Sequence, residues 1–156
     1  MLEVNIPGYG TLAFSFLVLD YNGTIACDGR LIPGVRDRLE ALSKNIALHI
    51  LTADTFGSVQ KEMTGIPCEV VVIGKENQTQ AKADYVRRLE AQETVSVGNG
   101  RNDALMLKEA VLGIAVIQEE GGAVETLLAA DIVTHSILDA LDLLLHPLRL
   151  TATLRS

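Results

Sequence analysis

The sequence predicts an α/β fold: a Rossmann-like, doubly wound, mainly parallel sheet with helices on both faces. Short runs of Val, Ile and Leu recur along the chain, as is typical of strands buried on both faces. Segments with apolar residues at helical spacing separate these runs. Aromatic residues make up 4% of the 156 residues and Trp is absent, so the core must be aliphatic. Alternating strands and helices favour right-handed crossovers, and the length predicts a single domain over 1–156.

The expected strands follow one another at short intervals. The first residues, LEVNI followed by PGYG, predict a β-hairpin that leads into the central strand. The central strand is the nearly continuous apolar run at 12–19, which ends at Asp20. Five further runs predict strands at 46–51, 70–73, 94–97, 112–117 and 131–134.

The segments between the strands predict helices. Apolar residues three and four positions apart share one face over 35–46, 77–91 and 137–145. Shorter helices are expected to begin near Thr55 and at about Asn102. The tail at 151–156 is expected to be frayed.

Composition and charge limit the possible partners and location. The net charge of −7 argues against a nucleic-acid partner, because an acidic surface repels phosphate backbones. The chain shows no signal peptide and no run of ~20 apolar residues, so we expect a cytoplasmic location and no membrane contact. Cys27 and Cys68 fit no disulfide or CxxC pattern, and we expect two buried free thiols.

Polar residues stand at the ends of three expected strands. Asp20, Thr52 and Asn99 each follow an apolar run at its carboxyl end. In an open parallel sheet, ligands bind beyond the carboxyl ends of the strands. The strand pattern therefore predicts one crevice in which these residues converge.

The pentad DYNGT at 20–24 has two interpretations. A carboxylate at the end of a strand can attack phosphorus or carbon and form a covalent intermediate, with the following amides holding phosphate oxygens. Asn22-Gly23 is equally a plain turn with Asp20 as a turn residue. The pentad taken alone favours the turn.

The hexad GNGRND at 98–103 predicts a tight glycine loop before a helix. Asn99 and Asp103 offer oxygen ligands that suit Mg²⁺. A dinucleotide-binding loop is the first alternative, but position 103 is Asp where GxGxxG needs Gly. Helix capping by Asn102 or Asp103 is the second.

Two further polar sites carry little information alone. The hydroxyl of Thr52 could bond a phosphate oxygen, with Ala53 beside it, whereas Asp54 is expected to cap the following helix. Lys82, early in the helix over 77–91, would by itself be a solvated surface lysine.

Together the four sites resemble the motifs of the haloacid dehalogenase (HAD) superfamily in order and spacing: DxxGT, a strand-end Thr, a Lys and GxGxND. The resemblance covers about residues 12–135. The motifs DYNGT, TAD and GNGRND are most similar to those of the phosphorylation domain of P-type ATPases, and the chain resembles the small soluble P-type-ATPase-like proteins. The intervals from Asp20 to Thr52 and from Thr52 to Lys82 leave no room for a cap domain or a nucleotide-binding domain. Ion pumping by this chain alone is thus excluded.

The resemblance implies a role for each matching residue. Asp20 would be the nucleophile, and Lys82 would neutralise developing negative charge. Thr52, Ala53 and Gly23 would bind the transferring phosphoryl group. Mg²⁺ would be held by Asp20, the backbone carbonyl of Asn22, Asn99 and, directly or through water, Asp103.

Two residues depart from the family pattern. Phosphatases of the superfamily usually carry Asp at the position of Asn22, which protonates the leaving group and then activates water. Asn22 cannot exchange that proton, and general acid–base catalysis contributes about 10²–10⁴-fold. Asn99 stands where a metal-binding carboxylate is usual, so metal binding should be weaker.

The resulting hypothesis is a Mg²⁺-dependent phosphohydrolase or phosphotransferase that forms a phospho-aspartyl intermediate on Asp20, with slow turnover. The alternative is a weakly active or inactive HAD-fold module with a regulatory or binding role. Dehalogenase chemistry ranks third, because the loop at 98–103 is of the Mg²⁺ type. Without a cap the site would be open, which predicts a large phosphorylated substrate or closure by another copy of the chain.

Overall fold

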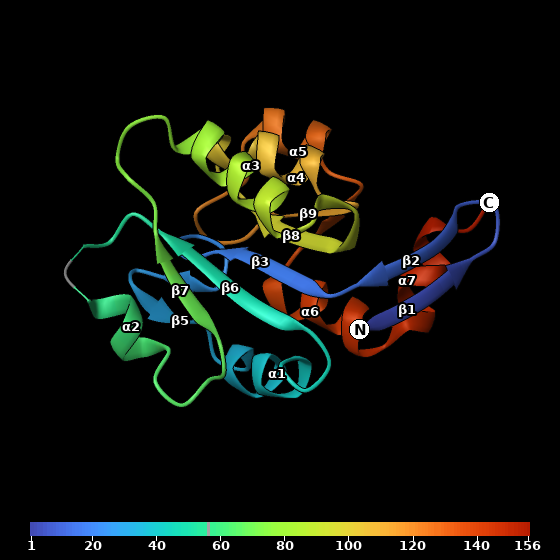
Figure 1. Cartoon of the computed structure of the whole chain (residues 1–156), viewed down its shortest axis with the longest axis horizontal. Helices are drawn as coiled ribbons and strands as arrows, with labels where there is room; N and C mark the ends of the chain where they lie inside the picture. Colours follow the sequence, from blue (N-terminus) through green and yellow to red (C-terminus); the bar gives the residue numbers. More distant parts are fainter. Residues whose placement is uncertain (56) are drawn as a thin grey trace.

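The computed structural model describes residues 1–55 and 57–156 and confirms the α/β class. Its centre is a six-stranded sheet in the order β10-β9-β8-β3-β6-β7, in which all the paired strands run parallel (Figure 1). The strands are β3 (Phe16–Asp20), β6 (Ala47–Thr52), β7 (Glu69–Val72), β8 (Thr94–Gly98), β9 (Leu112–Val116) and β10 (Ile132–Thr134).

The strand order reverses beside the central strand. From β3 the chain adds β6 and then β7 on one side, and then returns to add β8 and β9 on the other. Such a reversal opens a crevice at the carboxyl ends of the two strands that flank it. Here that crevice lies between the ends of β3 and β8, where Asp20 and Gly98 stand.

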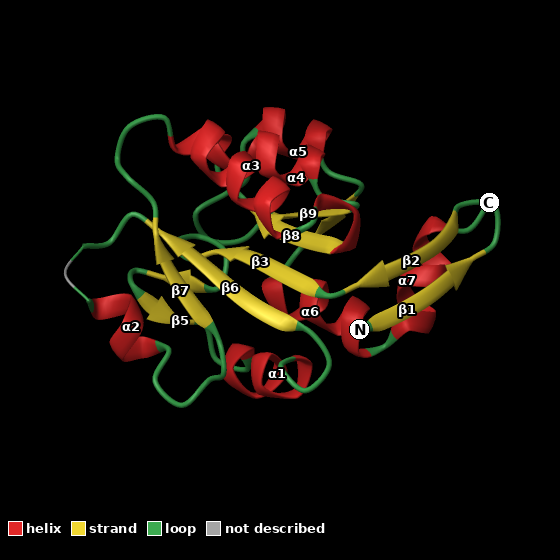
Figure 2. Cartoon of the chain, viewed as in Figure 1, coloured by secondary structure: helices red, strands yellow, loops and turns green. Residues whose placement is uncertain are grey.

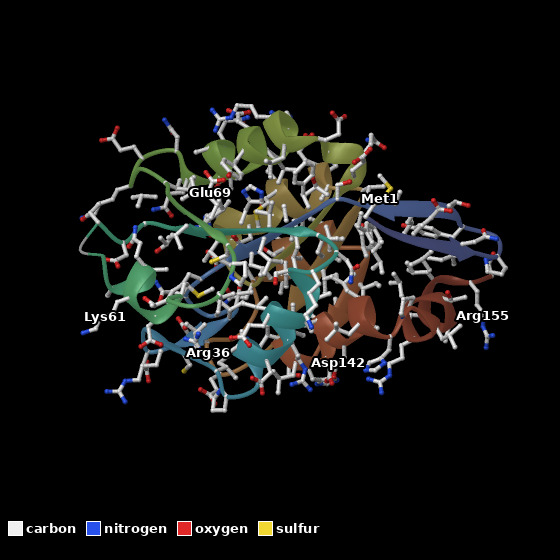
Figure 3. All side chains as sticks on the ribbon, turned by 60° about the horizontal axis from the view of Figure 1, so that its bottom comes forward. Met1, Arg36, Lys61, Glu69, Asp142 and Arg155 are labelled. Atoms are coloured by element: carbon white, nitrogen blue, oxygen red, sulfur yellow. The ribbon has the colours of Figure 1, made fainter. Side chains whose placement is uncertain are left out.

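Helices cover both faces of the sheet, as expected (Figure 2). One face carries α3 (Gln78–Leu89), α4 (Ala104–Glu109) and α5 (Val124–Ala129), which pack on one another in that order. The other carries α1 (Val35–Leu42) and α6 (Ile137–Leu145). The bidentate pair of Arg38 with Asp142 joins these two, and Asp142 is labelled in Figure 3. Buried aliphatic side chains fill both interfaces, which confirms the aliphatic core.

An N-terminal hairpin precedes the sheet, but the apolar run at 12–19 is not one strand. β1 (Leu2–Ile6) and β2 (Gly10–Phe14) pair antiparallel in a separate two-stranded sheet, and β3 begins only at Phe16. The backbone of Ser15 marks the break, because its N–H donates to Glu93 and its carbonyl accepts from Ala47. The chain therefore changes partners at Ser15, which continuous hydrophobicity cannot reveal.

The expected frayed tail is wrong. α7 (Pro147–Leu154) is helical and packs against β1, with Leu150 fully buried. The backbone N–H of Ser156 donates to the carbonyl of Pro7 at 3.1 Å. The hairpin thus supplies tertiary contacts that hold the end of the chain in place.

Several helix boundaries differ from the expectation. The helix over 35–46 ends at Leu42, and a turn brings Ile46 into the core. The helix expected near Thr55 is α2 (Ser58–Glu62), and Phe56 lies outside the described residues. A 3₁₀ turn over Arg101–Asp103 precedes α4 where the sequence predicts one helix from about Asn102.

The described parts of the segments that connect β3, β6 and β7 contain only short helices and strands. Between β3 and β6 the chain forms a small antiparallel hairpin, β4 (Ala26–Cys27) with β5 (Arg30–Leu31), and then α1. Between β6 and α3 the described residues add α2 and β7. No cap domain stands over the crevice in the part of the chain that the structure describes.

The histidine and the two cysteines predicted to be buried differ in how far they are covered. His49 is a buried core histidine, as predicted, with its Nδ1 2.8 Å from the hydroxyl of Tyr85. Cys27 and Cys68 are free, but both are only partly buried. Among the described residues, no helix has the length and apolar character needed to cross a bilayer.

Candidate active site

A cleft of 230 Å³ lies at the carboxyl end of the sheet. Six of the eight residues predicted from sequence line it: Asp20, Asn22, Thr52, Ala53, Lys82 and Asn99. Ile73, Gln78, Gly100, Asn102 and Glu120 complete its walls. The prediction that the strand ends converge is therefore confirmed.

Asp20 ends the central strand, and its two carboxylate oxygens have different partners. Oδ1 accepts from Lys82 Nζ at 2.8 Å. Oδ2 accepts from the hydroxyl of Thr24 at 3.3 Å. The backbone after Asp20 turns sharply, because the Tyr21 carbonyl accepts from the N–H groups of residues 24, 25 and 26. This turn holds Asp20 at the mouth of the crevice, with its side chain 13% exposed.

Lys82 is a buried cation and not the solvated surface lysine that its position alone would suggest. Its side chain is 4% exposed, and Nζ donates to Asp20 Oδ1 and Asp103 Oδ1, both at 2.8 Å. A third acceptor, Asn102 Oδ1, lies at 3.3 Å. An ammonium has three protons to donate, so this geometry satisfies all of them.

The charges in the cleft shift one another's pKa values. Burial, and then the neighbouring charge of Asp103, raise the pKa of Asp20 to about 7, against the attraction of Lys82. Burial acts to lower the pKa of Lys82, but the charges of Asp20 and Asp103 outweigh it and the net pKa is raised. Lys82 therefore stays charged at neutral pH, whereas Asp20 needs a further cation to be fully ionised.

Asp103 lies behind the cleft and organises the glycine loop. Its side chain is fully buried, and Oδ2 accepts from the backbone N–H groups of Asn99 and Gly100, both at 3.0 Å. A Cβ on Gly98 would lie 2.5 Å from Asp103 Cγ, so this close approach requires glycine. Oδ1 accepts from Lys82, so the two oxygens of Asp103 hold the lysine and the glycine loop in place.

Asn99 uses both ends of its amide within the protein. Oδ1 lies 3.2 Å from the Thr24 hydroxyl and shares its single proton with Asp20 Oδ2, and Nδ2 donates to the Gly121 carbonyl at 3.0 Å. The Asn99 carbonyl also accepts from the backbone N–H of Ala123. A carboxylate could not donate to Gly121, so the amide fastens the loop after β9 to the site.

Thr52 presents its hydroxyl to the cleft from the end of β6. Its Oγ1 accepts from the backbone N–H of Asp54 at 3.0 Å, which leaves the hydroxyl proton available to a ligand. Asp54 Oδ2 accepts from the backbone N–H of Val59 and from the Ser58 hydroxyl. Asp54 therefore bonds the first turn of α2, although the N-cap residue itself is Gly57 and not the predicted Asp54.

Gly23 and Asp103 are the two predicted residues that do not line the cleft. The backbone N–H of Gly23 donates to the Ala26 carbonyl at 2.8 Å within the turn. A contact between this amide and a phosphate would need the turn to open. Gly23 instead borders a second hollow beside the cleft.

Sequence reasoning missed residues that support the site from outside the motifs. Gln118 Nε2 donates to the carbonyls of Gly23 and Thr24, at 3.1 and 2.7 Å, and its Oε1 accepts from the Ile137 backbone N–H. Gln118 thus fixes the turn after Asp20 to α6. It directly follows the expected strand at 112–117, so the strand-end rule could have found it.

The donors around the cleft fit a hard divalent cation. Asp20 Oδ2 and Asn99 Oδ1 flank the same Thr24 hydroxyl, and both are oxygens of the kind that Mg²⁺ prefers. Mg²⁺ commonly uses one or two carboxylates and keeps several waters. The described residues contain no group of three or more His, Cys, Asp or Glu able to hold a metal.

No family model matches the chain, but its sequence is similar to those of several known proteins. An uncharacterised protein of Methanocaldococcus jannaschii is 53% identical over 64 residues, which are 41% of this chain and 69% of that protein. A soluble P-type ATPase-like phosphatase of the same organism is 30% identical over 146 residues. That match covers 87% of this chain but only 51% of the relative.

A solved structure has the same fold. It is 3-deoxy-D-manno-octulosonate 8-phosphate phosphatase from Moraxella catarrhalis, in complex with magnesium, phosphate and KDO. Its TM-score is 0.67 at 21% identity, over 85% of this chain and 86% of that one.

Proposed function

Because the chain belongs to the haloacid dehalogenase superfamily, we propose that it is a Mg²⁺-dependent phosphohydrolase or phosphotransferase that works through Asp20. One observation carries the proposal. The Asp20 carboxylate stands at the end of the central strand and accepts a 2.8 Å hydrogen bond from a buried lysine, in a cleft that Thr52 and Asn99 also line.

The proposed reaction has two displacements at phosphorus. An oxygen of Asp20 attacks the phosphorus of a phosphomonoester, and the bond from phosphorus to the leaving oxygen breaks. The released alkoxide takes a proton from water, because Asn22 has none to exchange. Water, or an acceptor alcohol, then attacks the phosphorus of the aspartyl phosphate, and the bond from phosphorus to the Asp20 oxygen breaks. The proton of the attacking oxygen passes to the hydroxide left by the first step, phosphate or a new ester leaves, and Asp20 regains its carboxylate.

The residues around Asp20 support charge neutralisation as the main catalytic effect. Lys82 donates a hydrogen bond to Asp20, the nucleophile, and its positive charge offsets the negative charge that builds up on the phosphoryl group. Thr52 has a hydroxyl proton to donate to a phosphoryl oxygen. These groups are fixed by hydrogen bonds before a substrate arrives, so little reorganisation is needed.

A divalent cation fits the same cleft through Asp20, the Asn22 carbonyl and Asn99. Magnesium and phosphate accompany the solved phosphatase of the same fold, which supports Mg²⁺ as the ion. Bound there, it would neutralise phosphoryl charge and align the ester for in-line attack. Asp103 is proposed to act on the metal indirectly, because its oxygens accept from Lys82 and from the loop amides.

The alternative function is a regulatory or binding module that holds phosphate and turns it over very slowly. Two features favour it. Asn22 removes the acid–base group, and Asn99 replaces a charged metal ligand by an amide that is already bonded to Thr24 and Gly121. An open cleft would then serve a phosphorylated macromolecule or a second copy of the chain.

Trapping with beryllium fluoride discriminates between these functions. A competent Asp20 should form an acyl-phosphate mimic with Mg²⁺ and beryllium fluoride, seen by fluorine NMR, and should hydrolyse a small aryl phosphate. Asp20→Asn should lose both signals, with activity reduced by more than about a thousandfold. Asp37→Asn, at an exposed position on α1, is the matched control and should retain them.

Two results would contradict the proposal. Equal aryl phosphate hydrolysis by the wild type and Asp20→Asn would reject Asp20 as the nucleophile. Absence of trapping in the wild type, together with recovery of a specific phosphorylated partner, would favour the binding module.

A further inference from the structure

A second hollow of 480 Å³ lies against the cleft, and we call it the side pocket. Three segments form its walls: Cys27 and Ile32 from the β4–β5 hairpin region, Glu119 and Glu120 from the loop after β9, and His135 with Ser136 from the segment after β10. None of these six residues belongs to one of the four sequence motifs.

The side pocket and the cleft share a border. Glu120 lines both hollows. Gly23 lines the side pocket, and its chain neighbour Asn22 lines the cleft. A phosphoryl group held over Asp20 would therefore lie beside the side pocket, and the organic part of a substrate could extend into it.

The charge of the side pocket is one-sided. Glu119 and Glu120 are exposed carboxylates, and no Lys or Arg is among the described residues that line the pocket. His135 is the single imidazole there, so the two carboxylates outnumber it even when it is protonated. The hydrogen bond to Glu119 raises the pKa of Cys27 to about 11, so this thiol stays neutral and donates to the carboxylate at 2.7 Å.

At the start of α6, two of the first three N–H groups already bond side chains of the protein. The N–H of Ile137 donates to Gln118 Oε1 at 2.8 Å, and the N–H of Asp139 donates to the Ser136 hydroxyl at 3.1 Å. Free N–H groups at a helix start commonly bind anions. Here these two are engaged within the protein.

We propose that the side pocket binds the leaving group of the substrate and selects phosphomonoesters whose leaving group is cationic or polyhydroxylated over those that carry a second negative charge. Carboxylates accept hydrogen bonds from ammonium and hydroxyl groups and repel other anions. The inference rests on the proposed function, and it adds a substrate class to it.

Two small esters whose leaving groups carry opposite charges test this inference. Phosphoethanolamine and 2-phosphoglycolate both have two carbons, one ending in an ammonium and the other in a carboxylate. With Mg²⁺ present, kcat/KM for phosphoethanolamine should exceed that for 2-phosphoglycolate by about tenfold or more, as expected for one partly screened charge pair. Competition of each ester with hydrolysis of an aryl phosphate should give inhibition constants in the same order.

Substitutions should assign the preference to the side pocket. The double change Glu119→Gln and Glu120→Gln removes both charges at nearly constant volume and should bring the ratio of the two esters close to one. Glu3→Gln, at an exposed position on the distant hairpin, removes a charge elsewhere and should leave the ratio unchanged.

The outcomes separate this inference from the proposed function. If the wild type hydrolyses an aryl phosphate through Asp20 but treats the two esters alike, or if the double variant keeps the preference, the side pocket inference is overturned and the proposed function stands. If the wild type neither hydrolyses aryl phosphate nor traps beryllium fluoride, both are overturned.

Discussion

The two ends of the parallel sheet differ in the kind of side chain that is buried there. At the carboxyl end, the buried lysine Lys82 bonds two carboxylates, one of them fully buried. At the amino end, the β1–β2 hairpin lies against α7 (Figure 1). The core there includes apolar side chains such as Phe14 and Leu150, both fully buried. Buried charges are costly unless paired, whereas buried apolar area stabilises directly. Pairing therefore limits the cost of buried charge at the carboxyl end, whereas burial of apolar side chains contributes stability at the amino end.

The largest expected effect comes from removing the cation at the polar end. Lys82→Met leaves Asp103 buried without its positive partner, and breaking a buried ion pair in this way costs about 3–5 kcal/mol. Urea unfolding should show that loss, and hydrolysis of aryl phosphate should fall with it. Lys108→Met, at an exposed position on α4, should change the free energy of unfolding by less than about 0.5 kcal/mol. An equal, small change in both variants would show that Lys82 is not an essential counterion.

The apolar end should affect stability without affecting chemistry. Phe14→Ala removes a fully buried ring from the hairpin and should lower the free energy of unfolding by about 3 kcal/mol, near the low end for such changes because the hairpin can relax. Activity per folded molecule should match the wild type. Tyr9→Ala, at an exposed ring of the same hairpin, is the control for urea unfolding. A specific loss of activity in folded Phe14→Ala would mean that the two ends are coupled.

Asn22→Asp should change the turnover of aryl phosphate without changing the free energy of unfolding. It restores a carboxyl group at an exposed position beside Asp20, and turnover of aryl phosphate should rise about a hundredfold, the low end for general acid–base catalysis. Asn5→Asp on the hairpin makes the same chemical change at the apolar end and should leave turnover unchanged. Unaltered turnover in Asn22→Asp would show that the missing acid does not limit the reaction.

The two ends also differ in how far sequence predicts them. At the polar end, Asp20, Thr52 and Asn99 were expected because each follows an apolar run, and parallel strands bring their ends together. Lys82 was expected only through the family resemblance, since its position in a helix gives no sign that it is buried. The position of Gln118 directly after an expected strand marks it as a candidate, but the sequence does not show that it contacts the turn after Asp20.

At the apolar end the sequence misleads for a tertiary reason. The run at 12–19 has uniform hydrophobicity, but Ser15 changes partners and divides it between two sheets. Pro147 is a local start signal for α7, but residues 151–156 contain several polar side chains, and the hairpin holds α7 in place through Leu150 and Ser156. Both features depend on which surfaces meet, and local propensity does not determine that.

The smallest expected effect is the release of at most one proton when a cation binds, and it tests whether the Asp20 carboxyl group is protonated before the cation arrives. The pKa of Asp20 is raised to about 7 by burial and by Asp103, so the carboxyl group is largely protonated at pH 6 and largely ionised at pH 8. A group with a raised folded-state pKa destabilises the fold as pH climbs from its unfolded value, near 4, to about 7. Mg²⁺ binding requires the ionised form and should release this proton.

Calorimetric titration with Mg²⁺ in buffers of different ionisation enthalpy measures that release. It should approach one proton at pH 6 and fall toward zero at pH 8, because the carboxyl group is then already ionised. Asp37→Asn, the exposed control, should behave as the wild type does, since its side chain lies away from the cleft. Release that is independent of pH would mean that Asp20 is already ionised when the cation arrives, and that Lys82 alone balances the buried charge at this end of the sheet.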